Sequence, residues 1–228
     1  MPKMDQAVVL LSGGMDSATL LAHVRSRLHV PCVHALTFDY GQKHACEIAM
    51  ARWQARAWHV ARHVEWKLDT LGANTTGSAL TDPDVEIPDL VRLDAEQRRQ
   101  PATYVPNRNM VFLSLAAAYA ESHGMRHVFY GAQAQDEYGY WDCSPQFVEK
   151  INGVLALNRR VPIVVHAPFV DRTKAELVEI GRALGVDYAH TWSCYRGGEE
   201  PCGECPTCVE RSKALGDAGS NESAPARS

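Results

Sequence analysis

Residues 7–17 read AVVLLSGGMDS, and this stretch decides the fold. An apolar run forms a strand of the buried type, two glycines permit a tight turn, and a helical pattern follows at once. A strand that passes through such a turn into a helix directs backbone N–H groups and the positive end of the helix dipole at one point. Ser12 and Ser17 add hydroxyl groups, and Asp16 can cap the helix or help to hold a magnesium ion. The stretch predicts a phosphate-binding loop, with an ordinary glycine turn and serine cap as the alternative.

Beyond this loop, strand and helix patterns alternate along the chain, which is typical of a Rossmann-like, doubly wound parallel sheet. We predict strands at residues 7–11, 32–38, 60–66, 127–131 and 161–167. We predict helices at residues 15–29, 44–58, 107–122, 145–157 and 173–185. Thr173 and Glu176 form a capping box at the start of the last of these helices. The expected fold class is therefore α/β, with a small C-terminal cysteine-rich segment.

The composition divides the chain into three parts. Residues 1–188 form the sheet domain, and residues 67–104, which contain three prolines, form a long insertion that is either a lid or a contact surface. Residues 189–215 contain the cysteine cluster. The small and polar tail at residues 216–228 is predicted to be disordered.

The overall composition excludes several classes of protein. The 228 residues carry a net charge of −4, and 46% of them are hydrophobic, which is typical of a globular protein without a broad basic surface for nucleic acid. The first residues lack the pattern of a signal peptide, and the longest apolar run, residues 110–120, is too short to span a membrane. We expect a cytoplasmic protein that has neither nucleic acid nor a membrane as its partner.

The cysteines gather near the C-terminus. Four of the seven follow the pattern C-x7-C-x2-C-x2-C: Cys194, Cys202, Cys205 and Cys208. Cys-x-x-Cys bends two thiolates onto one metal ion, and four thiolates complete a closed tetrahedral site, which favours one structural Zn²⁺ per chain. A redox pair, an iron–sulfur cluster and unmetallated thiols are the alternatives. Cys32 and Cys46 fall inside a predicted strand and a predicted helix, which favours a place in the core.

The motif SGGMDS resembles the signature of the PP-loop ATP pyrophosphatases, a superfamily of the HUP fold type. The resemblance implies that ATP is cleaved between its α and β phosphates, so that the loop holds pyrophosphate while an acceptor takes AMP. No Gly-Lys-Ser/Thr of a Walker P-loop occurs in the chain. The residues that this resemblance places at ATP are Leu11, Ser12, Gly13, Gly14, Met15, Asp16, Ser17 and Ala18.

Longer segments narrow the resemblance. In order, TFDYGQKHACEIAMA (37–51), TYVPNRNMVFLSLAAAYA (103–120), YGAQAQDEYGYWDCSPQF (130–147), DRTKAE (171–176) and WSCYRGGEEPCGECPTC (192–208) resemble the 7-cyano-7-deazaguanine synthases of queuosine precursor biosynthesis. The resemblance covers residues 7 to about 215. It implies a homodimer that converts 7-carboxy-7-deazaguanine, ammonia and ATP to the nitrile, by adenylation to an amide and a second adenylation that dehydrates it. The family usually has the sequence YPDCR where residues 140–144 are YWDCS. The proline whose ring stiffens the loop is therefore replaced by Trp141, and the arginine cation by Ser144.

Further nucleotide-site residues follow from position and chemistry. Asp39, Tyr40 and Gln42 follow the second predicted strand, at the carboxyl edge where such sheets bind ligands, although a capped helix start also explains them. Arg108 opens an apolar helix and can meet a phosphate or carboxylate, with a surface ion pair as the alternative. Lys174 can neutralise phosphate charge, with an ordinary surface lysine as the alternative. The candidate catalytic residues are Ser12, Asp16, Arg108 and Lys174.

The loop after the predicted strand at 127–131 supplies the acceptor site. Its acids, amide and aromatic ring suit the polar edge and the flat face of a purine-like heterocycle. Cys143 can act as a nucleophile, but a buried structural thiol is the favoured interpretation. The candidate substrate-binding residues are Gln133, Asp136, Tyr140, Asp142 and Cys143.

Two other functions compete with this one. A PP-loop enzyme that adenylates a tRNA base for thiolation needs a basic surface and spare cysteines, which the net charge and the cysteine pattern do not offer. A non-catalytic nucleotide-binding zinc protein does not explain a functionalised loop over the ATP edge. Ammonia must come from solution or from an external donor, because the chain has no glutaminase domain.

Overall fold

The computed structural model of the protein describes residues 4–134 and 140–216. Its centre is a sheet of five parallel strands in the order β3-β2-β1-β4-β5. The strands are β1 Gln6–Leu10, β2 Cys32–Asp39, β3 Arg62–Lys67, β4 His127–Phe129 and β5 Val164–His166. The five predicted strands are therefore confirmed in type and place, and the sheet is of the doubly wound kind.

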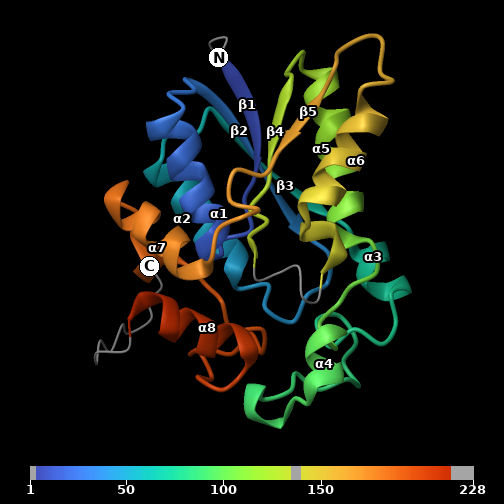
Figure 1. The fold of residues 1–228 in the computed structure, drawn as a ribbon, viewed down its shortest axis with the longest axis vertical. Coiled ribbons are helices and arrows are strands. Elements are labelled where there is room, and N and C mark those ends of the chain that lie inside the picture. Colours follow the sequence, from blue (N-terminus) through green and yellow to red (C-terminus); the bar gives the residue numbers. More distant parts are fainter. Residues whose placement is uncertain (1–3, 135–139, 217–228) are drawn as a thin grey trace.

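Helices cover both faces of this sheet, as Figure 1 shows. On one side lie α1 (Met15–Ala22), α2 (Glu47–Ala57) and α7 (Lys174–Ala183). On the other side lie α5 (Arg108–Ser122) and α6 (Pro145–Leu155). Because both faces are covered, the central strand β1 is apolar from Ala7 onward: Val8 packs in the core on the α5 side and Val9 in the core on the α1 side.

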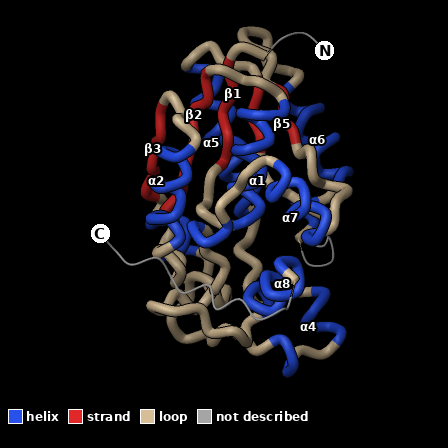
Figure 2. Tube along the Cα trace, turned by 90° about the vertical axis from the view of Figure 1, so that its left-hand side faces the viewer, coloured by secondary structure: helices blue, strands red, loops and turns tan. Residues whose placement is uncertain are grey.

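The remaining elements gather beyond the carboxyl ends of the strands, at the lower end of Figures 1 and 2. The region 67–104 forms α3 (Asp69–Asn74), the 3-10 turn η2 (Leu90–Arg92) and α4 (Ala95–Arg99). The C-terminal segment forms α8 (Pro206–Leu215), and short 3-10 turns lie at Trp141–Cys143 (η4) and Tyr188–His190 (η5). No helix among the described residues has the length and hydropathy that a membrane span requires.

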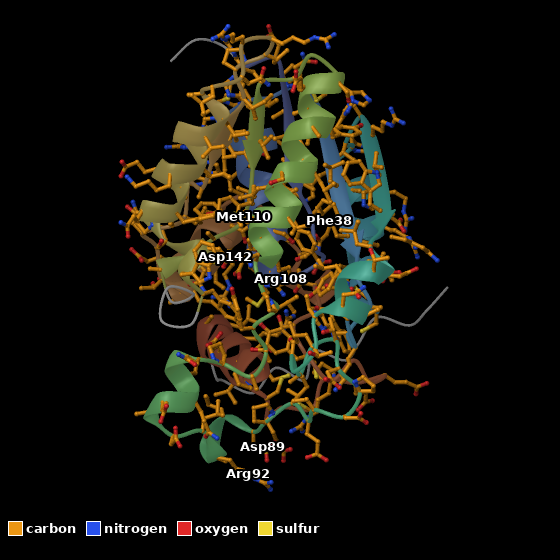
Figure 3. The ribbon with its side chains drawn as sticks, turned by 90° about the vertical axis from the view of Figure 1, so that its right-hand side faces the viewer. Phe38, Asp89, Arg92, Arg108, Met110 and Asp142 are labelled. Atoms are coloured by element: carbon orange, nitrogen blue, oxygen red, sulfur yellow. The ribbon has the colours of Figure 1, made fainter. Side chains whose placement is uncertain are left out.

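Direct contacts join the insertion to the cysteine segment. The backbone N–H of Leu90 donates to the carbonyl of Glu204 at 3.1 Å. Arg196 donates to the carbonyl of Ile87 at 3.1 Å and pairs with Asp89 at 2.5 Å. Figure 3 shows Asp89 at the end of the molecule farthest from the N-terminal ends of the strands. The insertion is therefore held in place by the C-terminal segment.

Several predicted helix boundaries are wrong. The helix predicted from residue 44 begins at Glu47, because residues 44–46 form a turn, and Cys46 is its N-cap rather than an interior residue. The helix predicted over 145–157 ends at Leu155, and the first helix becomes a π-helical turn, His23–Arg27 (η1), before it ends. The capping box of Thr173 at the start of α7 is confirmed.

Candidate functional site

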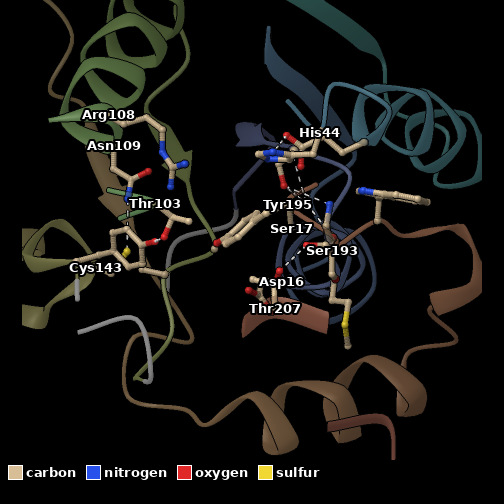
Figure 4. A pocket seen from close by; sticks show the side chains of 18 of the residues that line it. Asp16, Ser17, His44, Thr103, Arg108, Asn109, Cys143, Ser193, Tyr195 and Thr207 are labelled. Carbon is tan, nitrogen blue, oxygen red and sulfur yellow. Dashed lines mark hydrogen bonds and ion pairs between the residues drawn. The ribbon is translucent and has the colours of Figure 1, made fainter. Parts of the chain in front are cut away.

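A pocket of about 620 Å³ opens at the carboxyl ends of β1, β2 and β4. Its walls come from several parts of the chain: the SGGMDS loop, the end of β2 and the turn before α2, the insertion, the start of α5, the residues after β4, the segment with Tyr140 and Cys143, the start of α7 and the C-terminal segment. Figure 4 shows these walls facing one another, with Arg108 and Cys143 on one side and Asp16, His44 and Tyr195 on the other. This is the edge at which doubly wound sheets bind ligands.

Hydroxyl groups organise the SGGMDS loop. The N–H groups of Ser12 and Gly13 donate to Ser17 Oγ at 3.2 and 3.3 Å, and the N–H of Gly14 donates to Ser12 Oγ at 3.2 Å. Ser17 Oγ in turn donates to the Gly14 carbonyl at 3.1 Å. The N–H groups of Ser12, Gly13 and Gly14 are therefore already hydrogen-bonded to the two serine hydroxyls. The hydroxyls thus hold the loop in a shape suited to an anion.

Two other segments contact Gly13: α2 and the segment that contains Trp192. Its φ of +96° lies in the region that favours glycine, and a Cβ atom there would lie 2.0 Å from the Glu47 carbonyl oxygen. Its own carbonyl accepts the N–H of Trp192 at 3.0 Å and Gln54 Nε2 at 3.1 Å. Glycine is therefore required here for close contact with α2.

Asp16 does not cap α1: Gly14 is the N-cap residue, and it makes no side-chain cap. Instead, Asp16 Oδ2 lies 3.3 Å from Lys174 Nζ, which also lies 3.7 Å from Glu210 Oε2. The Lys174 side chain is only 12% exposed, so the surface-lysine alternative is wrong. The other oxygen of Asp16, Oδ1, is buried and has no hydrogen-bond partner among the described residues. Charges from the loop, α7 and α8 therefore meet at this wall.

Arg108 is a second fixed cation of the pocket. Its Nη1 donates to the Tyr40 hydroxyl at 3.0 Å, and the guanidinium lies 5.7 Å from the centre of the Tyr40 ring. Burial acts to lower the pKa of Arg108, but the nearby tyrosines, Tyr40 first among them, raise it above its ordinary value. The surface-ion-pair alternative is wrong, since the ion pairs found in the described part of the chain do not include Arg108.

The segment around Asp142 is joined to the start of α5. The N–H of Asn109 donates to Asp142 Oδ2 at 3.2 Å, and Asn109 Nδ2 donates to Cys143 Sγ at 3.4 Å. Asp142 is 2% exposed, and its Oδ1 has no hydrogen-bond partner among the residues described. Burial is the main cause that raises the pKa of its carboxyl group. Trp141, at the position where the resemblance expects proline, donates from Nε1 to the Tyr104 hydroxyl at 2.9 Å, which joins this loop to the end of the insertion.

Two buried polar residues escaped the sequence analysis. Glu47, at the start of α2, lines the pocket, and burial raises its pKa to about 8. His44 Nε2 lies 3.4 Å from Glu47 Oε1, and burial lowers the pKa of His44 to about 3. Near neutral pH the imidazole is therefore uncharged. Its Nδ1 is buried and has no hydrogen-bond partner among the described residues.

The structure brings together most of the candidate residues, but not all. The candidates that line the pocket are Leu11, Ser12, Gly14, Met15, Asp16, Ser17, Tyr40, Arg108, Tyr140, Cys143 and Lys174. The candidates that do not line it are Gly13, Ala18, Asp39, Gln42, Gln133 and Asp142. Asp136 lies outside the described residues.

Gln42 shows why position alone misleads. Its Oε1 accepts the N–H of Tyr40 at 2.8 Å, and its Nε2 donates to the Phe38 carbonyl and to Glu47, both at 3.2 Å. The side chain thus closes the turn after β2 and does not line the pocket.

Several of the pocket residues that the sequence analysis missed lie close to residues that it singled out. Asn109 adjoins Arg108, Glu47 follows Gln42 within the same segment, and Tyr195 and Glu210 flank the cysteine cluster. For these residues, closeness in the sequence to a recognised motif was the signal that could have identified them as part of the pocket.

The four clustered cysteines form a potential metal site. Their sulfur atoms all lie within 4.8 Å of one another, and those of Cys202 and Cys208 are 3.9 Å apart. The N–H of Cys202 donates to Cys194 Sγ, and that of Cys205 to Cys202 Sγ, both at 3.4 Å. Such N–H···S bonds stabilise thiolates, so the cluster could bind a metal such as zinc. Thr207 and Glu210 of the same segment line the pocket.

Comparisons with known proteins identify relatives of this chain. The chain is 43% identical over 224 residues to the 7-cyano-7-deazaguanine synthase of Thermoplasma acidophilum, covering 95% of this chain and 90% of that protein. It is 46% identical over 211 residues to the 7-cyano-7-deazaguanine synthase of Archaeoglobus fulgidus, covering 92% and 85%.

A solved structure shares the fold. The U34-tRNA thiolase NcsA from Methanococcus maripaludis, with its [4Fe-4S] cluster, aligns with a TM-score of 0.51 at 14% identity. The alignment covers 93% of this chain and 65% of that one, so the chain spans about two thirds of its length. The family model described as "Queuosine biosynthesis protein QueC" matches residues 6–219. The chain therefore belongs to the QueC family of queuosine biosynthesis proteins.

Proposed function

We propose that this protein is an ATP-dependent ligase that converts 7-carboxy-7-deazaguanine and ammonia to 7-cyano-7-deazaguanine. One observation carries the proposal: the SGGMDS loop and the Asp142 segment face a single pocket at the carboxyl edge of the sheet. An adenylating enzyme needs this arrangement, because the α-phosphate of ATP must meet the acceptor. We infer the substrate from the names of the relatives, which are 7-cyano-7-deazaguanine synthases.

The nucleotide half of the site consists of fixed donors and cations. We assign Ser12 and the loop backbone to the departing pyrophosphate, with Lys174 and Arg108 to stabilise the charge that builds on it. Asp16 fits Mg²⁺, since its Oδ1 is a buried carboxylate oxygen with no hydrogen-bond partner in the described chain. A bound Mg²⁺ would neutralise phosphate charge and orient the leaving group.

The acceptor half suits a guanine-like edge. Asp142 does not line the pocket itself, but it adjoins Cys143, which does. Its Oδ1 is buried and has no hydrogen-bond partner in the described chain, and we assign this carboxyl group to the N–H groups of such an edge. Tyr140 and Phe112 line the same pocket and offer flat faces to a ring. An acid that lacks these N–H groups would leave Asp142 unpaired, at a cost of about 1–3 kcal/mol.

The cysteine cluster fits one structural zinc ion. Zn–S bonds of about 2.3 Å in a tetrahedron place the sulfur atoms about 3.8 Å apart. The 3.9 Å between Cys202 and Cys208 matches that spacing. With four thiolates no position stays open for catalysis, so the ion would fasten the segment that carries Thr207 and Glu210 to the pocket. The homodimer, the cytoplasmic location and the division at residue 188 stay predictions.

Mass spectrometry of the complete reaction tests the function. Incubation with ATP, Mg²⁺, ammonium and 7-carboxy-7-deazaguanine should give the amide, then the nitrile, with AMP and pyrophosphate as co-products. Ser12→Ala should abolish product formation, while Ser114→Ala, on the exposed side of α5, should not. ADP and phosphate as primary products, or pyrophosphate release stimulated only by a different acid, would refute the proposal.

A further inference from the structure

Arg108 is a cation of the pocket that has no acidic partner. Among the described residues that line the pocket, Arg108 and Lys174 carry the permanent positive charges, and Lys174 lies beside Asp16 and Glu210. In the described chain, the hydrogen-bond acceptor of the Arg108 guanidinium is the neutral hydroxyl of Tyr40. A guanidinium group has five N–H donors in a planar fork, so most of these donors remain for a ligand. Such a group in the wall of a pocket calls for an anion.

The two carboxyl groups near Arg108 do not supply that anion. Burial raises the pKa of Glu47 to about 8, so this group is mostly protonated at neutral pH, and Gln42 donates a hydrogen bond to it at 3.2 Å. Asp142 Oδ2 accepts the N–H of Asn109 at 3.2 Å. No ion pair in the described part of the chain joins Arg108 to either acid. The guanidinium therefore has no direct anionic partner within the described residues.

The backbone turn before α5 places this cation at the start of a helix. Asn107 has a φ of +56°, in the left-handed region that residues other than glycine seldom occupy, and its N–H donates to the Tyr104 hydroxyl at 3.2 Å. Arg108 follows as the first residue of α5, whose first turn contains no acidic residue. A cation at this end opposes the helix dipole and does not stabilise the helix. The guanidinium and the dipole instead both favour an anion at this point of the pocket.

Arg108 belongs to the acceptor half of the pocket. Figure 4 shows it next to Asn109, on the wall that also carries Thr103 and Cys143, and across the pocket from Asp16. The anion that it meets first is therefore one that enters with the acceptor.

The neighbouring segment at residues 140–144 cannot take over this task. Its sequence, YWDCS, contains no cation. The Ser144 hydroxyl donates to the Trp141 carbonyl at 2.8 Å and accepts the N–H of Phe147 at 3.1 Å, so it caps α6. Within the acceptor half, the positive charge comes from Arg108.

We propose that the Arg108 guanidinium binds the carboxylate of the acid through two parallel N–H···O bonds, and that it thereby sets the preference of the first half-reaction for a carboxylic acid. This inference rests on the function proposed above. A guanidinium group matches a carboxylate in both shape and charge. It also reduces the repulsion between the carboxylate and the phosphates of ATP, two anions that must come within bonding distance.

The first adenylation starts from this complex. A carboxylate oxygen forms a bond to the α-phosphorus of ATP, and the bond from that phosphorus to the oxygen that bridges to the β-phosphate breaks. The electron pair of the broken bond leaves with pyrophosphate, and no proton is transferred. The acyl adenylate no longer carries the carboxylate charge, so Arg108 can then offset the charge on pyrophosphate, as proposed above.

The second adenylation provides an internal comparison. Its acceptor is the amide, which is uncharged and offers Arg108 one carbonyl oxygen. A hydrogen bond to an ionised acceptor is roughly twice as strong as one to a neutral acceptor. Loss of Arg108 should therefore impair the use of the acid more than the use of the amide. Loss of a cation that serves the phosphates alone should impair both alike.

Steady-state kinetics of pyrophosphate release tests this assignment, with the acid as varied substrate at saturating ATP and ammonium, and separately with the amide. Arg108→Gln should lower kcat/KM about 100-fold for the acid and about 10-fold for the amide, so the acid-to-amide ratio should fall about 10-fold. Lys174→Met should lower both values and keep the ratio. Arg126→Gln, exposed in the turn before β4, should behave as wild type.

Calorimetric binding gives a second readout that needs no turnover. The wild-type protein should bind 7-carboxy-7-deazaguanine at least about 10-fold more tightly than 7-deazaguanine, which lacks the carboxylate, and Arg108→Gln should bind the two alike. If Arg108→Gln does not fold, Arg108→Lys replaces it. That variant keeps the charge without the planar fork, so it should lower the acid-to-amide ratio to a smaller extent.

An unchanged acid-to-amide ratio in the folded variant would overturn the carboxylate assignment, since Arg108 would then serve the phosphates alone, and it would leave the proposed function intact. Equal affinity of the wild-type protein for the acid and for 7-deazaguanine would overturn the assignment as well. Failure of the wild-type enzyme to release pyrophosphate with the acid would instead refute the proposed function.

Discussion

Gly13→Ala is the sharpest test of how the phosphate-binding loop is built. The new Cβ would lie 2.0 Å from the Glu47 carbonyl oxygen and 2.9 Å from the Ala51 nitrogen. Both are backbone atoms, so no side chain can rotate away. Ordinary van der Waals contact begins near 3.4 Å, and the loop and α2 must therefore separate by roughly 1.4 Å.

The loss of stability in Gly13→Ala has two parts, backbone strain and steric overlap, and comparison with Gly77→Ala separates them. A side chain at a φ of +96° costs about 1–2 kcal/mol, and Gly77→Ala, at +82°, pays a similar penalty. Gly77 has no atom within 4 Å of its would-be Cβ, whereas overpacking at Gly13 adds about 1–3 kcal/mol. The variants should differ by this second amount, which is about 2–12 °C in melting temperature for a domain of this size.

Thermal unfolding of both variants, followed by circular dichroism, gives the difference. Pyrophosphate release should be lost in Gly13→Ala, because the Gly13 carbonyl also anchors Trp192 and Gln54, and it should persist in Gly77→Ala. Equal melting temperatures, or full activity of Gly13→Ala, would show that the loop and α2 are not packed as described.

Lys174→Met should slow pyrophosphate release about 100-fold or more, because Lys174 is the buried cation beside Asp16; Lys213→Met, exposed on α8, should have no such effect in the same assay. Cys208→Ser should remove the bound metal, measured by atomic emission, and lower the melting temperature, whereas Cys32→Ser should keep the metal. Burial raises the pKa of Glu47 to about 8 from 4.5, so between these values the folded protein holds a proton that the unfolded chain releases. Chemical denaturation should therefore show stability falling as pH rises from about 5 to 8, and Glu47→Gln should flatten that fall; an unchanged slope would contradict the burial of this carboxyl group.

The sequence sufficed for the sheet and the loop because both depend on local patterns. An apolar run, a glycine turn and a helix appear in consecutive residues, and parallel strands bring their carboxyl ends to one edge. This geometry alone predicts that residues after β1, β2 and β4 meet. The cysteine spacing was equally informative, since a tetrahedral site constrains ligand order.

The contacts between distant segments could not be predicted in the same way. Glu210 meets Lys174 through the packing of α8 on α7, and no periodic pattern encodes that pairing. Gln42 turns inward because its amide satisfies two backbone groups of a tight turn, a local hydrogen-bond choice that outweighs its position at the ligand edge. In the sequence, Glu47 is indistinguishable from an ordinary acidic residue in the first turn of a helix. Only the structure shows that this residue is buried.

The hydrogen bond from Trp192 to Gly13 has a consequence for how the enzyme is made. It joins residues roughly 180 positions apart, so the loop acquires its final anchor only after nearly the whole chain has been synthesised. At bacterial to eukaryotic elongation rates this interval is roughly 10–40 s. During that time the nascent sheet carries the complete SGGMDS sequence but lacks the wall formed by Trp192, Thr207 and Glu210. A nascent chain that ends before Trp192 therefore has a phosphate-binding loop without this hydrogen bond.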